Sequence, residues 1–509
     1  MTGFLRLVHA EFTKLRTVRG WIVGLILAVA AMTGLGVLPG MSGGCNRSDS
    51  HCVLPVGPGG EEVTDQFTYV HQALAGDGSL TVRVASLAGA AAGGEVPRLA
   101  PWAKAGLLIK DGTRPGSAYA AVLLTGAHGV RMQYDFTHDR AGAAGVSGSR
   151  WLRLTRTGDT ITGEESADGT AWTTVGTARL PGLPATAQAG LFVTSPQYAE
   201  QVGVAGAMGG PTRATAAFDH VARQGAWAGA EWTTDSIGDG AAELGGPAAS
   251  DAHGGPAASG PGRDEAPTVE RSGDTFTLSG SGDIAPAVAG AAGIGVTISQ
   301  TLVGTFAALL FLVVIGAMFV AAEYRRGLIR TTLAAAAGRG RVLAAKAVVL
   351  GAVTFAAGLV AAAIVVTVGQ RVLRANGVYV HPASAFTEVR VVVGTAALLA
   401  VAAVFALALG VLLRRGTLAV TAAVALVVLP YLLAMTVLPA GAAQWLLRVS
   451  PAAAFALQQS TPQYPQVANL YTPPNGYFPL PPWAGFAVLA AWAAVALAAA
   501  TILIRRRDA

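Results

Sequence analysis

Long apolar stretches recur along the chain and are separated by short polar segments. Five of them are uninterrupted, and a sixth, at 417–438, is interrupted only by Pro430. Each supplies the roughly 20 residues that an α-helix needs to cross the hydrocarbon core of a membrane. The pattern therefore predicts six transmembrane helices. Their expected ranges are 21–39, 297–322, 342–368, 389–413, 417–438 and 484–504.

A pattern typical of strands fills the chain between the first two helices. Residues 61–222 contain short runs of strand-forming residues, such as 80–84 and 119–124, and Gly, Asp-Gly and Pro-Gly turn signals separate them. Many short strands at this spacing predict an antiparallel β-sandwich. The predicted fold class is therefore a membrane α-helical protein with six transmembrane helices and an inserted all-β sandwich domain.

The two connections of this sandwich differ in length and composition. Residues 223–296 are predicted to be a linker rich in Gly, Ala and Pro, followed by one return strand at 275–278, because such a composition buries little apolar surface. The other connection, 40–60, is a short tether. With one connection short and the other slack, we expect the sandwich to hang over the helices without being part of their wall.

The short tether contains both cysteines of the chain, Cys45 and Cys52. Their close spacing and an oxidising exterior favour a disulfide that closes a small loop. The alternative is a pair of free thiols.

Basic residues are distributed unevenly across this membrane topology. When the helices are threaded alternately, fifteen of the nineteen Lys and Arg residues outside 40–296 lie on the side of both termini. By the positive-inside rule both termini are cytoplasmic, including the tail 505–509, and residues 40–296 are extracellular. Lysine is scarce relative to arginine, which is typical of high-GC bacterial genomes. The predicted location is therefore a bacterial plasma membrane, crossed several times.

The net charge of +6 is the sum of two opposite parts. Residues 40–296 carry 16 basic and 25 acidic residues, and the remainder carries 19 basic and 4 acidic residues. The basic part is explained by anchoring beside anionic lipid, which makes the lipid bilayer a partner and argues against nucleic acid. The acidic part is long enough to bury a core of its own.

The predicted helices lack the groups that power transport. Their central portions carry almost no ionisable residues, which disfavours a proton- or ion-coupled transporter. A P-loop requires Gly-Lys followed by Ser or Thr, and none of the four lysines follows a glycine. No metal or other cofactor is expected on this chain. If transport consumes ATP, another subunit binds it.

The N-terminal segment 1–20 is predicted to be an interfacial helix on the cytoplasmic surface. Its apolar residues recur at helical spacing, whereas Arg6, Glu11, Lys14 and Arg16 lie largely off the apolar stripe. An ordinary solvated lead-in is the alternative. The residues of the stripe are Phe4, Leu7, Val8, Phe12, Leu15 and Val18.

The cytoplasmic segment 323–341 begins with Glu-Tyr-Arg-Arg-Gly-Leu-Ile-Arg-Thr-Thr-Leu, and 10–17 reads Ala-Glu-Phe-Thr-Lys-Leu-Arg-Thr. With these segments and its six predicted spans, about half of the chain resembles the permease subunit of type-2 ABC exporters. The resemblance implies that 323–333 is a coupling helix that docks on a separate ABC ATPase subunit. It also implies an elbow helix at the N-terminus and a second permease subunit, identical or a paralogue. Without the resemblance, the arginines would be read as topology determinants alone.

The resemblance assigns roles to two sets of residues. The docking residues are Glu323, Tyr324, Arg325, Arg326, Gly327, Arg330 and Thr331. The residues of the interfacial elbow helix are Phe12, Lys14, Leu15 and Arg16.

The sandwich is similar to a second family, the concanavalin A-like and laminin G-like domains. The similarity is carried by 102–109 (WAKAGLLI), 151–156 (WLRLTR) and 166–172 (SADGTAW), the last being a hairpin with an Asp-Gly turn. Such domains often bind glycans through exposed aromatic rings, which makes Trp102, Trp151 and Trp172 candidate sugar contacts. The alternative is that these rings belong to the core. No pair of carboxylates with acid–base geometry is visible, so catalysis is not expected.

The last extracellular loop, 439–483, is predicted to contain interfacial helices over 442–459, followed by a proline-rich irregular stretch. Taken together, these observations predict a permease subunit of an ATP-driven exporter. It would form the translocation path but not bind ATP. The alternative is a membrane-anchored glycan-binding or sensing protein without transport activity. The substrate is left open.

Overall fold

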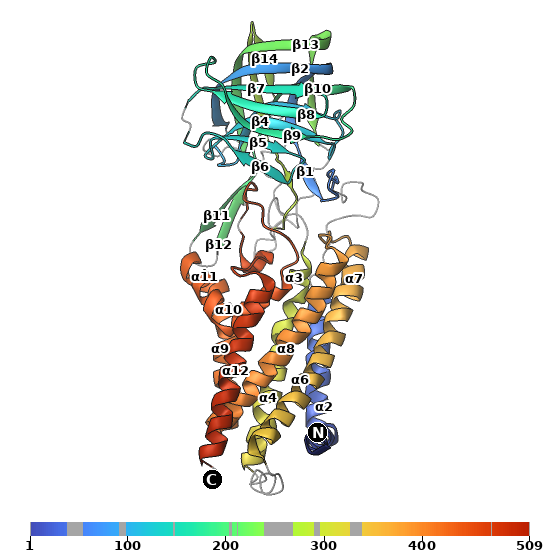
Figure 1. Ribbon diagram of the computed structural model, residues 1–509, viewed down its shortest axis with the longest axis vertical. Helices are drawn as coiled ribbons and strands as arrows, with labels where there is room; N and C mark the ends of the chain where they lie inside the picture. The colour runs from blue at the N-terminus through green and yellow to red at the C-terminus, as the bar shows by residue number, and fades with distance from the viewer. Residues whose placement is uncertain are drawn as a thin grey trace, which may run out of the picture.

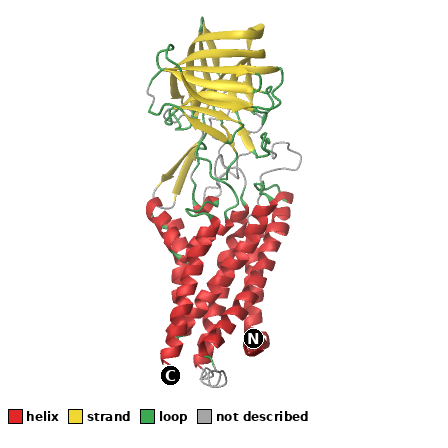
Figure 2. Ribbon diagram, in the orientation of Figure 1, coloured by secondary structure: helices red, strands yellow, loops and turns green. Residues whose placement is uncertain are grey.

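The computed structural model describes residues 2–37, 54–90, 98–145, 148–202, 206–210, 212–238, 268–289, 296–325, 338–469 and 471–507. A β domain, called the sandwich below, stands on one end of an elongated bundle of helices (Figures 1 and 2). The first and last described helices both reach the opposite end, called the distal end below (Figure 1). The predicted fold class, an all-β domain inserted into a helical membrane protein, is confirmed. Cys45 and Cys52 lie outside the described residues.

Five helical segments of the described chain are long and apolar enough to cross a membrane. Three are single helices, α2 (Arg19–Val37), α8 (Ala385–Leu413) and α12 (Pro482–Arg507). The other two are continued by short helical pieces at the sandwich end. The first is α3 (Ile298–Thr301), η5 (Leu302–Gly304) and α4 (Thr305–Arg325); the second is α6 (Arg339–Ile364), the π-helical η6 (Val365–Gly369) and α7 (Gln370–Ala375).

The predicted span 417–438 is a bent pair of helices. Its halves, α9 (Gly416–Val427) and α10 (Leu429–Thr436), meet at an angle of 41°. Pro430 explains the break, because proline has no backbone N–H and its ring clashes with the carbonyl of the preceding turn. The described chain therefore has six spans only if this bent pair crosses as one.

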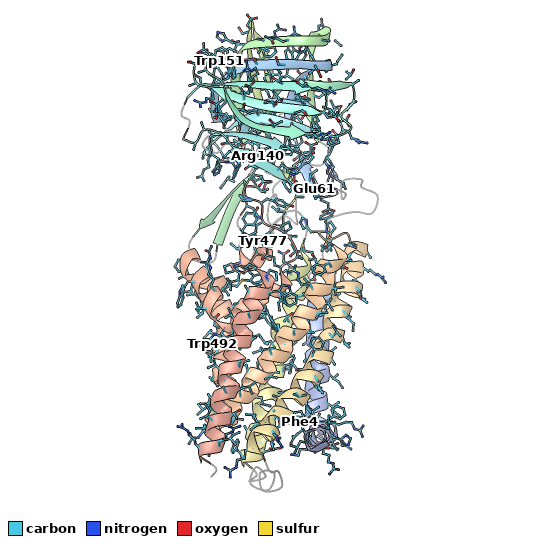
Figure 3. The ribbon with its side chains drawn as sticks, in the orientation of Figure 1. Phe4, Glu61, Arg140, Trp151, Tyr477 and Trp492 are labelled. Atoms are coloured by element: carbon cyan, nitrogen blue, oxygen red, sulfur yellow. The ribbon has the colours of Figure 1, made fainter. Side chains whose placement is uncertain are left out.

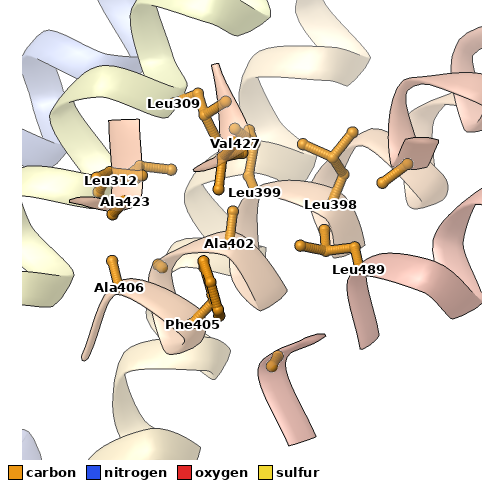
Figure 4. Close-up of a cluster of buried hydrophobic side chains, with 14 of the residues drawn as sticks. Leu309, Leu312, Leu398, Leu399, Ala402, Phe405, Ala406, Ala423, Val427 and Leu489 are labelled. Carbon is orange, nitrogen blue, oxygen red and sulfur yellow. The ribbon is translucent and has the colours of Figure 1, made fainter. Parts of the chain in front are cut away.

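Helices α4 and α8 form the centre of the bundle, and the other helices surround them. Leu309 and Leu312 of α4 face Leu399 and Ala406 of α8 within one buried cluster (Figure 4). Small residues allow the two backbones to approach closely. A Cβ on Gly316 would lie 2.3 Å from the carbonyl oxygen of Ala403. Close packing through small residues is the usual way in which helices associate in lipid.

The sandwich has two layers that share one long strand. The first half of β2 (Phe67–Ala90) pairs with β10 (Thr186–Thr194), and its second half pairs with β7 (Arg150–Thr157). The strand changes layer near Gly76, whose φ of 81° is left-handed and favours glycine. The space between the layers is filled by an apolar core that includes Leu107, Val122 and Leu154.

The remaining strands complete these layers in antiparallel order. Strand β13 (Arg213–Ile237) pairs along both halves of β2, and its N-terminal part also pairs with β15 (Thr275–Gly280), which in turn pairs with β14 (Val269–Ser272). Beyond β10 the larger layer continues through β3 (Lys104–Lys110), β4 (Tyr119–Thr125), β5 (Val130–Tyr134) and β6 (His138–Ala141). The smaller layer adds β8 (Thr160–Ser166) and β9 (Thr173–Arg179) to β7. A separate hairpin, β11 (Tyr198–Val202) and β12 (Gly206–Gly210), extends towards the helices (Figure 1).

The sandwich takes up more of the chain than the sequence predicted. Strand β13 continues to Ile237, and β14 and β16 (Ile284–Pro286) also lie within the range 223–296, which was predicted to hold a linker and one return strand. Strand β15 covers that return strand, predicted at 275–278. The pairing of β13 with β2 joins residues more than 120 positions apart, so local composition could not indicate it. The sequence Gly-Gly-Pro-Ala-Ala-Ser, which occurs at 245–250 and again at 254–259, lies outside the described residues.

Two buried ion pairs fix the base of the sandwich. Strand β1 (Val63–Asp65) pairs with β16, and Asp65 accepts a hydrogen bond from Lys110 Nζ at 2.7 Å. Asp283, next to β16, accepts one from Lys104 Nζ at 2.6 Å. Both lysines are fully buried. Burial lowers the pKa of Lys110, and the negative charge of Asp65 offsets part of that effect.

These pairs hold the segments that lead to the helices. Asp65 lies on β1, Asp283 lies just before β16, and both lysines lie on β3. The ion pairs therefore anchor the first and last strands of the sandwich to β3, in the middle of the domain. Because β14, β15 and β16 follow the predicted slack linker and rejoin the sandwich, that linker is not the connection between the sandwich and the helices. That the sandwich hangs over the helices without being part of their wall stays a prediction.

The loop between α10 and α12 also differs from the prediction. Helix α11 (Ala440–Val449) exposes Trp445 at 64%, as an interfacial helix would. By contrast, all eight residues of the 3₁₀-helix η7 (Pro451–Gln458) are buried, and η7 packs against α8 and α12. A Cβ on Gly485 of α12 would lie 2.2 Å from the carbonyl oxygen of Ala453, so the backbones are in close contact. A further short 3₁₀-helix, η8, spans Pro473–Asn475.

We predict that segment 54–289 folds when it is secreted alone, and that segment 54–222 does not. The shorter segment lacks β15, whose Phe276 and Leu278 are in the core, and it leaves Lys104 buried without Asp283. An unpaired buried charge costs about 3–5 kcal/mol. Thermal denaturation followed by circular dichroism tests this, with 54–289 lacking 240–266 as the matched deletion control. A cooperative transition in 54–222 would contradict the prediction.

Candidate functional site

Four charged side chains meet at the distal end of the bundle. Lys346 Nζ of α6 donates to Glu11 Oε2 and to Glu323 Oε1, both at 2.7 Å. Lys14 Nζ donates to Glu11 Oε1 at 2.9 Å and to Glu323 Oε1 at 3.3 Å. Glu11 and Lys14 lie on α1 (Thr2–Thr17), and Glu323 lies on α4. These four residues are called the charge cluster below.

The charge cluster is buried and electrically balanced. The exposed fraction of the side chain is 2% for Lys346, 3% for Glu11 and 12% for Glu323, and it rises to 43% for Lys14. Two ammonium groups face two carboxylates, so no net charge is enclosed. The ring of Phe319 lies 5.0 Å from Lys346 Nζ and adds a cation–π contact. Buried ions of this kind are tolerated only when each has partners.

Lys14 remains charged at neutral pH. Partial burial lowers the pKa of its ammonium group, but the hydrogen bonds and negative charges of Glu11 and Glu323 outweigh burial and raise that pKa above its usual value. A raised lysine pKa means that its contribution to stability is complete below the usual pKa of 10.5 and is lost only above it. The pairs made by Lys14 are therefore intact throughout the physiological pH range.

Helix α1 lies crosswise to the long helices of the bundle. Figure 1 views it end-on at the N-terminus, and Figure 3 labels Phe4 upon it. Its inner side carries Glu11 and Leu15, both buried, while Phe12 is 43% exposed. The sequence had placed Glu11 off the apolar stripe, yet the structure buries it. The reason is that Lys346 supplies a partner from a helix more than 300 residues away.

The charge cluster holds both ends of one connecting segment. Helix α4 ends at Arg325, two residues after Glu323, and α6 begins at Arg339, seven residues before Lys346. A second contact holds α4 on its other side, where the guanidinium carbon of Arg414 lies 5.3 Å from the ring centroid of Tyr324. Arg414 is the left-handed cap of α8, with φ of 53°. The charge cluster and the Arg414–Tyr324 contact thus connect the distal ends of α4, α6 and α8.

The sequence-predicted docking and elbow residues separate into three groups. Glu323 and Lys14 belong to the charge cluster, while Leu15 and Tyr324 pack beside it. Phe12 and Arg16 are exposed on α1. Arg326, Gly327, Arg330 and Thr331 lie outside the described residues, as does the side chain of Arg325.

Sequence reasoning missed Glu11 and Lys346 as site residues. A signal was available for Lys346, since it is the single charged residue in the apolar stretch 342–368. A charge within such a stretch indicates a functional or structural partner by default. Nothing local indicated that Glu11 was that partner.

The candidate sugar contacts occupy different environments. Trp102 is only 7% exposed and stacks on His128 with ring centroids 4.0 Å apart, which corrects its assignment as an exposed ring. The guanidinium carbon of Arg153 lies 4.1 Å from the ring centroid of Trp172. Trp151 lies two residues before Arg153 on β7, so both side chains are on the same face of the strand. The rings of Trp151 and Trp172 therefore share the outer face of the smaller layer. Trp151 is labelled in Figure 3.

The hairpin turn between β8 and β9 forms where the sequence predicted it. Gly169 has φ of 80°, and hydrogen bonds from the backbone N–H groups of Ala171 and Thr170 lower the pKa of Asp168. Within the described residues, no group of three or more His, Cys, Asp or Glu side chains is placed to hold a metal ion.

Long apolar helices, a balanced charge cluster at one end and a β domain at the other define a multi-pass membrane protein. Residues 138–509 match the family model described as "ABC-2 family transporter protein", and the chain belongs to this family. It is thus a transporter membrane subunit, not itself catalytic, in a family that works with an ABC ATPase.

Comparisons with individual proteins add little to this assignment. No curated protein matches the sequence. One similar solved structure is a functionally unknown protein from Saccharomyces cerevisiae, at 14% identity and a TM-score of 0.20, covering 31% of this chain and 73% of that one. Another is the GH43 protein BlXynB from Bacillus licheniformis, at 13% identity and a TM-score of 0.18, covering 23% and 24%. No inference about fold or activity follows from either.

We predict that Lys346→Met releases α1 from the bundle. Glu11 and Glu323 would then face each other with only Lys14 to neutralise them, at a cost of about 3–5 kcal/mol. Thiol labelling of a Leu15→Cys reporter should become faster, because Leu15 is buried on the inner side of α1. Arg341→Met, an exposed arginine on the same helix, is the matched control.

A second substitution sharpens this test. Adding Glu323→Met to Lys346→Met leaves the Lys14–Glu11 pair balanced, so labelling should return towards the rate of the parent reporter. Equal labelling rates in the parent, Lys346→Met and Arg341→Met reporters would show that the charge cluster does not hold α1.

Proposed function

We propose that this chain is the permease subunit of an ATP-driven exporter, and that segment 323–333 docks a separate ATPase subunit. The observation that carries the proposal is the charge cluster, which joins both ends of the segment between α4 and α6 to α1. A segment fixed at both ends transmits a displacement to the helices that hold it. The family membership supports an ABC ATPase as the source of that displacement.

The chemistry of the segment suits a docking role. Arg326 and Arg330 are four residues apart, so in a helix they would share one face. Guanidinium groups form bidentate hydrogen bonds with carboxylates, which gives a contact both strength and fixed orientation. An acidic groove on the ATPase is therefore the expected counterpart.

In the proposed mechanism, the ATPase moves the distal ends of α4 and α6 together. Lys346 is bonded to carboxylates on both α1 and α4, so the elbow helix follows. Helix α8 follows as well, because Gly316 and Ala403 bring its backbone against α4. Movement at the distal end is thereby passed to the centre of the bundle, where the translocation path would open between two permease subunits.

The proposed orientation places the distal end in the cytoplasm and the sandwich outside the cell. Arginines cluster at the distal end, as the positive-inside rule requires for a cytoplasmic face. Exposed Trp445 and Trp483 lie on α11 and at the start of α12, at the sandwich end of the bundle. Indole rings favour the membrane interface, so these residues suit the outer boundary of the bilayer.

A glycan-contacting role for the sandwich is favoured by one observation. Trp151 and Trp172 are half-buried on the same outer face, and Arg153 between them is paired with Glu164 at 2.7 Å. Flat rings beside paired polar groups can stack on a sugar and bond its hydroxyls. This role would accompany transport.

We predict that Arg325→Glu, Arg326→Glu and Arg330→Glu together abolish co-purification with the ATPase. The reversed charges would repel the acidic groove. Affinity capture from membranes, followed by identification of a co-purified ATPase that carries a P-loop, provides the measurement. The triple Arg→Lys variant keeps the positive charge and is the control for correct insertion. Intact capture by a correctly inserted triple Glu variant would refute docking through this segment.

A further inference from the structure

One loop is attached to the sandwich at one end and to the centre of the bundle at the other. It comprises η7 and the following residues 459–469, and it is called the clasp below. Gln466 of the clasp is buried at the sandwich base, where its Nε2 donates to the carbonyl oxygens of Thr137 at 3.3 Å and Phe136 at 3.5 Å. Asn469 Nδ2 donates to the carbonyl oxygen of Ala289 at 2.9 Å.

Apolar contacts reinforce these hydrogen bonds. Val467 packs with Ala285 of β16 and with Val288, just after β16, in a small buried cluster. The clasp therefore contacts two parts of the sandwich: the turn between β5 and β6, and the segment that leads from β16 towards α3. Figure 1 shows this loop rising from the helices to the base of the β domain.

The turn that receives Gln466 is conformationally fixed. Asp135 and Phe136, between β5 and β6, have φ of 43° and 58°, left-handed values that non-glycine residues rarely adopt. Such backbone persists only where the surroundings determine it. Here the side chain of Phe136 is buried and meets the ring of Tyr119 edge-on at 4.9 Å. The acceptor carbonyls thus belong to a rigid part of the sandwich.

The other end of the clasp is fixed among the helices. Gln458 Nε2 donates to Thr305 Oγ1 of α4 at 2.9 Å and to Thr395 Oγ1 of α8 at 3.3 Å. All three residues are buried. Phe455 of η7 also stacks on Phe306 of α4, with ring centroids 4.6 Å apart. Displacement of α4 or α8 would therefore carry η7 with it.

The stretch between the two ends is short and braced. Only seven residues separate Gln458 from Gln466, and Pro462 and Pro465 restrict their backbone. Tyr471 Oη donates to the carbonyl oxygen of Tyr464 at 2.6 Å and accepts from its N–H at 3.0 Å. A short, braced connection transmits displacement, whereas a flexible one would absorb it.

We infer that the clasp couples the position of the sandwich to the arrangement of α4 and α8. Movement of these helices would displace the sandwich through Gln458, Gln466 and Asn469. Conversely, a ligand or a load on the sandwich would restrain the helices, because coupling between two sites is reciprocal. The inference rests on the proposed function only in naming α4 as a helix that an ATPase moves.

Amide hydrogen exchange of the full chain in lipid nanodiscs, without any ATPase, tests the coupling. Gln466→Ala should accelerate exchange of η7 amides at 451–458, and Gln458→Ala should accelerate exchange in the turn and strand at 135–141. We expect about fivefold or more in each direction, the low end of ordinary coupling between sites. Gln463→Ala, an exposed glutamine in the same loop, should leave both regions unchanged.

Changes confined to the mutated end in both variants would overturn the inference. Exchange in β3 and β4 reports whether the sandwich is intact. If Gln466→Ala disturbs these strands, the milder Asn469→Ala replaces it and must still accelerate exchange of η7. Because no ATPase is present, a failure of docking through 323–333 would leave this result unaffected, so the two proposals fail separately.

Discussion

A charge buried away from water must have a partner of opposite charge, and in this molecule such ion pairs connect distant segments of the chain. Each of these ion-paired connections is called a joint below. All four lysines of the chain pair with carboxylates. Lys14 and Lys346 join α1, α4 and α6 at the distal end, and Lys104 and Lys110 anchor the two connections of the sandwich. In each case the ion pair links segments that are far apart in sequence. Removing one partner would leave the other charge stranded, which makes each joint specific as well as strong.

The helices between these joints are held by a different kind of contact. Gly316 against Ala403, and Gly485 against Ala453, bring backbones together with no polar side chain involved. Such packing depends on close fit between small residues rather than on side-chain hydrogen bonds. The molecule therefore combines fixed charged joints at its ends with a closely packed apolar centre. This division suits a protein that passes movement along its length.

Much of this architecture could be predicted from local pattern, and the exceptions have a common physical cause. Apolar length predicted the long helices, and Pro430 marked the bend between α9 and α10. Composition failed for β13, whose alanines and glycines gain their stability from pairing with β2. It failed again for η7, which was predicted to be part of the interfacial helices over 442–459 but is buried against α8 and α12. Lys346 was visible as a lone charge, but its partner Glu11 depended on a contact across the fold.

The pairing of the lysines has a practical consequence for chemical labelling. Lys14 is the one lysine with an exposed side chain, at 43%, and the other three lysine side chains are at most 2% exposed. Reagents that acylate primary amines would thus find Lys14 accessible in the folded chain, while the other lysines are masked. Any slow acylation of Lys104, Lys110 or Lys346 would mark the moment at which that joint opens. The scarcity of lysine thereby gives each joint its own natural chemical reporter.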